Sequence, residues 1–277
     1  MKKALVISGG GSKGAFGAGV VCSKEKNYDL YVGTSTGALI ALMAAAGKYS
    51  ELKYLYNNFS NEMIYESDPF NKKGQLSKFK AVMNLIKGKS SFGKTTKLLD
   101  LIRENYTIHD HYNIHSKNIE IVVVVSNMTT KKAEYKSSRN LTWKEFTYWA
   151  WISTLAYPYA ETEIVDGCEY ADGGFTVNFP IRFATSKSDF IDAIIHSPNE
   201  INEVFENENV LQGIPSIINM LMASNMQKDI ESGNHFLQRG KEINYIFTPY
   251  ELTESPMFFD KKQMRNWFNL GFNFDEL

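Results

Sequence analysis

The sequence predicts an α/β protein built on a mainly parallel sheet that helices cover on both faces. Two observations carry this prediction. Short apolar runs alternate with helical patterns over short connections, which is typical of parallel sheets. The run at 119–126 contains four consecutive valines, as expected of a strand buried on both faces. In such sheets the functional loops lie at the carboxyl ends of the strands.

Each element is predicted from its local pattern. The first fifty residues indicate a strand at 3–8, a glycine-rich turn at 9–14, a helix at 15–26, a strand at 28–32 and a helix at 38–46. Apolar residues at helical spacing indicate helices between 49 and 112. Asp166 and Gly167 stand between two short apolar arms and indicate a β-hairpin. The other predicted elements are strands at 131–137, 190–195 and 242–247 and helices at 143–155, 214–230 and 261–270.

Length and composition limit the class of protein. The 277 residues, of which 43% are hydrophobic, suffice for one large core, so we expect a single domain over 1–277. Within it we expect a helical, lysine-rich insertion around 49–112 and a helical, aromatic tail around 251–277. A net charge of −1 gives no reason to expect nucleic acid as a partner. Cys22 and Cys168 alone cannot supply a disulfide framework or a four-ligand zinc site.

The sequence also bears on location. No run approaches the roughly 18 apolar residues that a membrane span requires. The glycine-rich turn at 9–14 interrupts the one N-terminal stretch that is similar to a signal peptide. We therefore expect a cytoplasmic or peripheral membrane protein, and delivery into another cell stays open.

The stretch Gly33-Thr34-Ser35-Thr36-Gly37 has the pattern of a nucleophile elbow. It follows an apolar strand and precedes an apolar helix, so Ser35 is predicted at a sharp turn. Glycines on both sides are needed because the serine backbone is strained and the two elements pass close to each other. The predicted result is an exposed hydroxyl at a helix N-terminus, where the helix dipole favours a developing anion.

The glycine-rich turn Gly9-Gly10-Gly11-Ser12-Lys13-Gly14 permits three interpretations. A dinucleotide site requires an acidic residue about 20 positions later, but the second strand ends in Gly33-Thr34-Ser35. A phosphate-binding loop requires Ser or Thr after the lysine, where this chain has Gly14. The third interpretation is an oxyanion hole formed by backbone N–H groups of the turn, and it agrees with the nearby elbow.

A serine nucleophile needs a base. Asp172 follows the second arm of the hairpin and precedes two glycines, which leaves its side chain free to project. A histidine base is the alternative, because His196 or His235 can follow Asp172 in the order found in α/β-hydrolases. However, the elbow of the α/β-hydrolases follows the fifth strand, whereas the elbow of this chain follows the second predicted strand, which argues against a histidine base.

Three ordered motifs resemble the patatin-like phospholipase family: the turn at 9–14, the elbow around Ser35, and Asp172-Gly173-Gly174. The segment 154–158 is similar to the Ser-x-Ala-x-Pro motif of that family. The resemblance implies a three-layer α/β/α fold and a Ser-Asp dyad that acts on membrane lipids without metal or cofactor. Ser35 is then the nucleophile and Asp172 the general base. The residues assigned to the oxyanion hole are Gly9, Gly10, Gly11 and Ser12, and those supporting the elbow and the turns are Lys13, Gly14, Gly33, Gly37, Gly173 and Gly174.

The expected activity is that of a phospholipase A or lysophospholipase, with phospholipid as substrate. Transfer of the acyl group to an acceptor other than water and a membrane-binding protein with the same fold remain alternatives. The segment 72–97 contains eight lysines and no acidic residue, which favours contact with an anionic membrane surface. The other interpretation of these lysines is the solvated face of a packed helix. The aromatic residues at 143–151 are expected in the core, with the wall of an apolar channel as the alternative.

Overall fold

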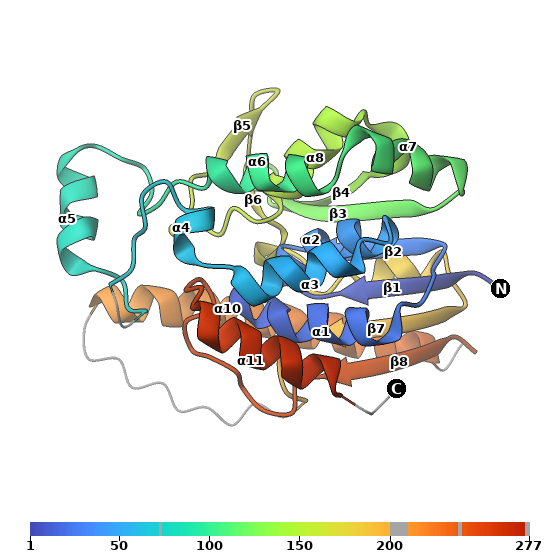
Figure 1. Cartoon of the computed structure of the whole chain (residues 1–277). Helices are drawn as coiled ribbons and strands as arrows, with labels where there is room; N and C mark the ends of the chain where they lie inside the picture. Colours follow the sequence, from blue (N-terminus) through green and yellow to red (C-terminus); the bar gives the residue numbers. More distant parts are fainter. Residues whose placement is uncertain (72–73, 200–209, 238–239, 275–277) are drawn as a thin grey trace.

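The computed structural model describes residues 1–71, 74–199, 210–237 and 240–274. Within these ranges one sheet of eight strands forms the centre of the molecule (Figure 1). The strand order is β5-β6-β3-β2-β1-β7-β8, and β4 also pairs with β3. In chain order the strands are β1 (Lys3–Ile7), β2 (Leu30–Thr34), β3 (Glu120–Asn127), β4 (Lys132–Ser137), β5 (Glu163–Val165), β6 (Cys168–Asp172), β7 (Phe190–Ile195) and β8 (Glu242–Phe247).

The sheet is mainly parallel, as predicted. Strands β3, β2, β1, β7 and β8 run parallel, and Val6 pairs with Val32 on one side and with Ala193 on the other. The antiparallel pairs are confined to β4, β6 and β5, which form the hairpins after β3 and at Asp166. The family resemblance therefore predicted the architecture correctly.

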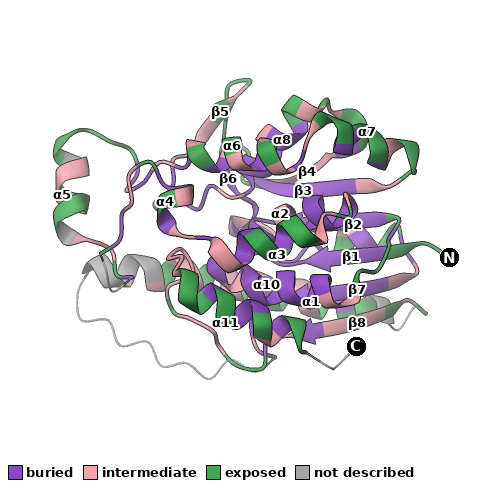
Figure 2. Cartoon of the chain, viewed as in Figure 1, coloured by how far each residue is buried: buried purple, intermediate pink, exposed green. Residues whose placement is uncertain are grey.

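Helices cover both faces of the sheet. Because side chains alternate along a strand, Leu5 and Ile7 face one core while Ala4 and Val6 face the other. Figure 2 shows that β1, β2, β3 and β7 are almost wholly buried, whereas β4 and β5 contain no buried residue and exposed residues lie on the helices and the loops. The helices are α1 (Gly14–Lys24), α2 (Thr36–Ala45), α3 (Tyr49–Asn58), α4 (Asn61–Ile64), α5 (Lys78–Ile86), α6 (Thr96–Asn105), α7 (Ile108–Ser116), α8 (Trp143–Ile152), α9 (Ile181–Thr185), α10 (Val210–Leu237) and α11 (Lys261–Phe272).

The helices of the lysine-rich insertion and of the aromatic tail differ in how they pack. Helix α5, in the lysine-rich insertion, stands apart from the body of the molecule (Figure 1). Helix α11, in the aromatic tail, packs on α1 and α3 instead. Helix α10 extends beyond the predicted 214–230 at both ends. The expected domain bounds stay a prediction, and residues 275–277 of the tail lie outside the described residues.

Strand pairing brings two distant parts of the chain together. On β3, Val124 pairs with Thr34, the last residue of β2, and Val125 pairs with Asp172, the last residue of β6. Strand β6 thus joins β3 where β2 ends. Ser35 follows Thr34 directly, so the sheet itself places Ser35 beside Asp172. Among the described residues, no helix is both long and apolar enough to cross a bilayer.

Candidate active site

Ser35 occupies the sharp turn between β2 and α2. Its backbone has φ 55° and ψ −127°, in the region of positive φ that non-glycine residues seldom adopt. A Cβ at Gly33 would collide with the backbone of Gly37, and a Cβ at Gly37 would collide with the carbonyl oxygen of Ile7. The two elbow glycines are therefore required by close backbone approach, as the sequence predicted.

The side chains of Ser35 and Asp172 are in direct contact. The Ser35 hydroxyl donates a hydrogen bond of 2.6 Å to Asp172 Oδ2, and the Gly174 amide donates one of 2.8 Å to Oδ1. Both carboxylate oxygens are thus held, which fixes the orientation of the carboxyl group. Asp172 is fully buried, and Ser35 is only 5% exposed, so the prediction of an exposed serine hydroxyl is wrong.

Burial changes the acid-base properties of Asp172. Desolvation raises the pKa of Asp172 from 3.8 to about 7, although the hydrogen bonds from Ser35 and the Gly174 amide lower it. An ordinary aspartate is a weak base at neutral pH. The shifted pKa makes this carboxylate a better proton acceptor in the pH range where enzymes work.

Ser153 is a polar residue of the site that the sequence did not reveal. Its hydroxyl accepts a hydrogen bond of 2.9 Å from the Ser35 amide and donates one of 2.6 Å to the carbonyl oxygen of Val124. Two residues later, the Leu155 carbonyl oxygen accepts a hydrogen bond of 2.9 Å from the Asp172 amide. The chain after α8 therefore positions the backbones of both Ser35 and Asp172. Its only signal in the sequence is its place beside the motif at 154–158.

The glycine-rich turn lies between β1 and α1, and two of its amides are already bound. Gly9 donates to the carbonyl oxygen of Asn178 at 3.0 Å, and Ser12 donates to that of Pro256 at 2.7 Å. For the amides of Gly10 and Gly11, the described part of the chain provides no hydrogen-bond acceptor. Of the four residues predicted for the oxyanion hole, these two have free N–H groups.

The supporting residues lie around this centre. Lys13 forms an ion pair of 2.9 Å with Glu251, and both side chains are largely buried. Gly14 lies against Thr36, Gly173 against the backbone of Val124, and Gly174 against the side chain of Met222, so that a Cβ at any of the three would collide.

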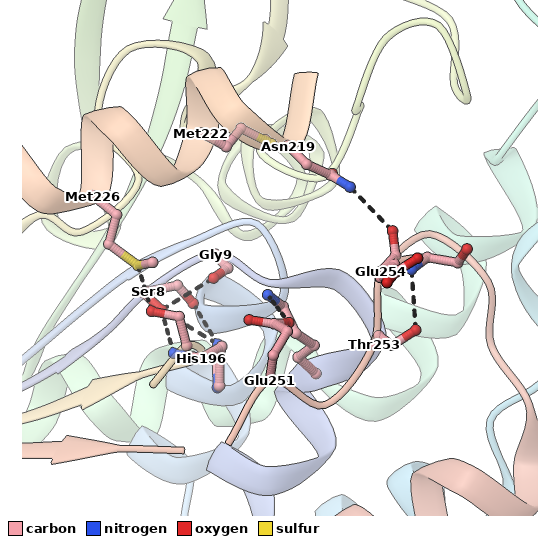
Figure 3. A network of polar contacts seen from close by, with 12 residues as sticks. Ser8, Gly9, His196, Asn219, Met222, Met226, Glu251, Thr253 and Glu254 are labelled. Atoms are coloured by element: carbon pink, nitrogen blue, oxygen red, sulfur yellow. Dashed lines mark hydrogen bonds and ion pairs between the residues drawn. The ribbon is translucent and has the colours of Figure 1, made fainter. Parts of the chain in front are cut away.

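The two histidines considered as bases lie elsewhere. His196 follows β7 behind the glycine-rich turn, where its Nδ1 donates to the Ser8 carbonyl oxygen at 2.9 Å (Figure 3). Burial and the nearby charge of Lys13 lower the pKa of His196 to about 4, so the ring is neutral at pH 7. His235 is exposed on α10. Asp172 contacts Ser35 without an intervening imidazole.

Ser35 lines two cavities of different chemistry. The first, which we call the apolar cavity, measures about 50 Å³ and is walled mainly by apolar side chains that include Leu39, Phe59 and Met257. The second measures about 450 Å³ and also contacts Gly10 and Lys13. We call it the polar cavity because more polar side chains line it than line the first, although four methionines also line it. The apolar wall comes from α2, α3, α4, α6 and the loops around 155 and 257, whereas Trp149 packs on Tyr170. The aromatic residues of α8 lie in the core, as the first of the two interpretations expected.

No metal ligands gather at this site: across the described ranges, no group of three or more His, Cys, Asp or Glu side chains is arranged to hold an ion. The parts present are a serine at an elbow, a buried carboxylate and two free backbone amides. These are the parts that acyl-transfer chemistry uses.

The fold and the site define an α/β protein with a serine at a nucleophile elbow. The family model of patatin-like phospholipases matches residues 5–185, and the chain belongs to this family. Members of this family are lipid acyl hydrolases. The solved structure of VipD from Legionella pneumophila is similar, with a TM-score of 0.43 and 15% identity. The match covers 98% of this chain and 65% of the VipD chain. A comparison with curated proteins gave no match.

Proposed function

We propose that this protein cleaves fatty acyl esters of phospholipids, as a phospholipase A or lysophospholipase, through a Ser35–Asp172 dyad. The observation that carries the proposal is the 2.6 Å hydrogen bond from the Ser35 hydroxyl to Asp172. A nucleophile and its base must lie within hydrogen-bond reach, and here they do.

In the proposed reaction, Ser35 Oγ attacks the ester carbonyl carbon while its proton passes to Asp172 Oδ2. The N–H groups of Gly10 and Gly11 bind the oxyanion that forms. The intermediate then collapses, the alcohol part of the lipid leaves with the proton from Asp172, and the acyl group stays on Ser35. Asp172 then takes a proton from water, which attacks the acyl-enzyme, and as the fatty acid leaves this proton passes from Asp172 to Ser35 Oγ, which regenerates the free serine.

The two cavities suggest how the lipid is oriented. An acyl chain is apolar and suits the apolar cavity, whereas the glycerol and head group need polar surroundings. The polar cavity supplies these through groups such as Lys13, Asn219 and Gln227. Since Ser35 lines both cavities, the ester bond is expected to lie between them.

We also propose that α5 brings the protein to the membrane. The side chains of Phe79, Val82 and Ile86 are 76%, 51% and 74% exposed and recur at helical spacing. Lys87 and Lys89 are exposed at the end of this helix. An apolar stripe next to lysines is the pattern of helices that lie in the membrane interface.

We expect only some of the eight lysines at 72–97 to contact the membrane, because three of them are bound within the protein. Lys80 donates to the carbonyl oxygens of Asp68 and Phe70, and Lys94 lies 3.7 Å from a carboxylate oxygen of Glu66. Lys97 donates to the Glu62 carbonyl oxygen. Lys72 and Lys73 lie outside the described residues, as does the side chain of Lys78.

Two substitutions test the dyad. Ser35→Ala removes the nucleophile, and Asp172→Asn keeps the shape of the side chain while removing the base. Each is expected to lower kcat for release of fatty acid from phosphatidylcholine vesicles by about 10⁴-fold. A serine-directed fluorophosphonate is expected to label the wild-type protein and not Ser35→Ala. Wild-type turnover in either variant would disprove the assignment, and products carrying the acyl group on an added alcohol would favour the acyltransferase.

A further inference from the structure

A further apolar cavity, which Ser35 does not line, lies next to the apolar cavity described above. This inner cavity measures about 30 Å³ and is lined by side chains that include Leu52 of α3 and Ile102 of α6. The two cavities share lining residues, and these form the wall between them: Leu39, Tyr56, Phe59 and Leu98. We call these four residues the dividing wall.

Several contacts hold the dividing wall in place. The Tyr56 hydroxyl lies 2.8 Å from Thr36 Oγ1, next to the nucleophile. The Tyr56 ring packs edge-on against Phe59, with 5.2 Å between ring centroids. Tyr56, Phe59 and Leu98 are 3%, 6% and 6% exposed, so they have little freedom to move aside.

We propose that the dividing wall sets the number of acyl carbons that bind beside Ser35, and that Leu98 is the residue that separates the inner cavity from this site. The inference rests on the proposed function, because it takes the apolar cavity as the place of the acyl chain. Opening the wall at Leu98 would then lengthen the chain that the protein binds.

The cavity volumes suggest where the limit lies. About 10–15 Å³ of cavity holds one group the size of water, so the apolar cavity has room for roughly four such groups. Each methylene that fits is expected to raise kcat/KM about fourfold, and further methylenes are expected to add nothing. The inner cavity would add room for about two more groups.

The test compares two leucine-sized truncations on one helix. Leu98 and Ile102 are 6% and 7% exposed and lie one turn apart on α6, but Leu98 belongs to the dividing wall whereas Ile102 lines the inner cavity. We would measure kcat/KM with p-nitrophenyl esters of straight-chain acids from two to twelve carbons. In the wild type and in Ile102→Ala, kcat/KM is expected to stop rising at about five carbons, the carbonyl carbon and the roughly four groups that the apolar cavity holds. In Leu98→Ala it is expected to rise for about two carbons more, a gain of about sixteenfold for the longer esters relative to the wild type.

A second variant covers the case in which Leu98→Ala does not fold. Leu98→Phe reduces the apolar cavity and is expected to end the rise at a shorter chain. The proposal is wrong if the Leu98 variants show the wild-type chain-length profile, or if Ile102→Ala lengthens the profile as Leu98→Ala does. If the wild type cleaves the esters and Ser35→Ala does not, the proposed function stands even when the Leu98 variants have no effect on chain length. Absence of such cleavage in the wild type would overturn both.

Discussion

Asp172 can accept a proton only in its charged form, and its burial determines the pH at which that form is present. Desolvation raises the pKa of Asp172 to about 7. We therefore expect kcat/KM to fall about tenfold for each pH unit below 7 and to level off above it. Initial rates on a soluble short-chain ester between pH 5 and 9 give this profile. A rate that stays constant down to pH 5 would show that the carboxyl group ionises in its ordinary range.

The raised pKa of Asp172 also makes the free energy of unfolding depend on pH, and comparison with Asp172→Asn measures this dependence. A raised pKa means that the folded protein binds the proton more tightly than the unfolded chain, so charging Asp172 at higher pH opposes folding. The free energy of unfolding of Asp172→Asn minus that of the wild type should increase between about pH 4 and 7, by at most about 1.4 kcal/mol per pH unit. Above pH 7 the difference should stay constant. Urea unfolding at several pH values measures it.

In the proposed reaction Ser153 is a positioning residue, because its hydroxyl binds the backbone amide of Ser35 and the carbonyl oxygen of Val124. Ser153→Ala removes a hydroxyl that both accepts from the Ser35 amide and donates to Val124. Leaving these buried backbone groups unpaired should cost about 1–3 kcal/mol of stability and lower kcat more than it changes KM. Ser188→Ala is the matched control, because Ser188 is 1% exposed and its hydroxyl has no hydrogen-bond partner among the described residues. Equal effects of the two substitutions would contradict this role.

At the scale of the elements, the sequence predicted what its local patterns encode. The strands at 119–126 and 190–195 and the helices after the glycine-rich turn and the elbow appear where periodicity and glycine placement indicate them. Local pattern could not show that β6 joins β3 where β2 ends, since strand pairing is a long-range property. The meeting of Ser35 with Asp172 was predicted from the family resemblance, and the structure supplies its cause in the register of β3.

Apart from Ser153, the parts of the site that the sequence missed act through their backbone. The Pro256 carbonyl oxygen binds the Ser12 amide, and the Leu155 carbonyl oxygen binds that of Asp172. A backbone carbonyl group is present at every position, so it leaves no signature in residue type. For this reason the sequence indicated four amides for the oxyanion hole. Only the structure showed that the carbonyl oxygens of Asn178 and Pro256 bind two of them and leave those of Gly10 and Gly11 free.

At the scale of the whole molecule, the active site and the exposed apolar helix lie at the same end. Strand β1 points toward the end where α5 and the start of α10 are found, and Ser35 follows β2, which runs parallel to β1 (Figure 1). Helix α10 adds exposed apolar side chains there, Ile217 and Met220, at 55% and 52%. A membrane that met this end would lie on the side of the sheet where β2 ends next to Ser35.

Phe79→Asp tests this orientation. The substitution places a charge in the apolar stripe of α5 and removes a phenyl ring whose burial in the interface is worth about 1.5–3 kcal/mol, so binding to vesicles with anionic lipid should weaken at least tenfold. Sedimentation with vesicles measures binding, in a Ser35→Ala background so that the lipid stays intact. Ile108→Asp is the control, because Ile108 is 50% exposed on α7, at the opposite end of the molecule (Figure 1). If both aspartate variants bind as tightly as their parent, α5 does not face the membrane; if both lose binding equally, the loss is not specific to that end.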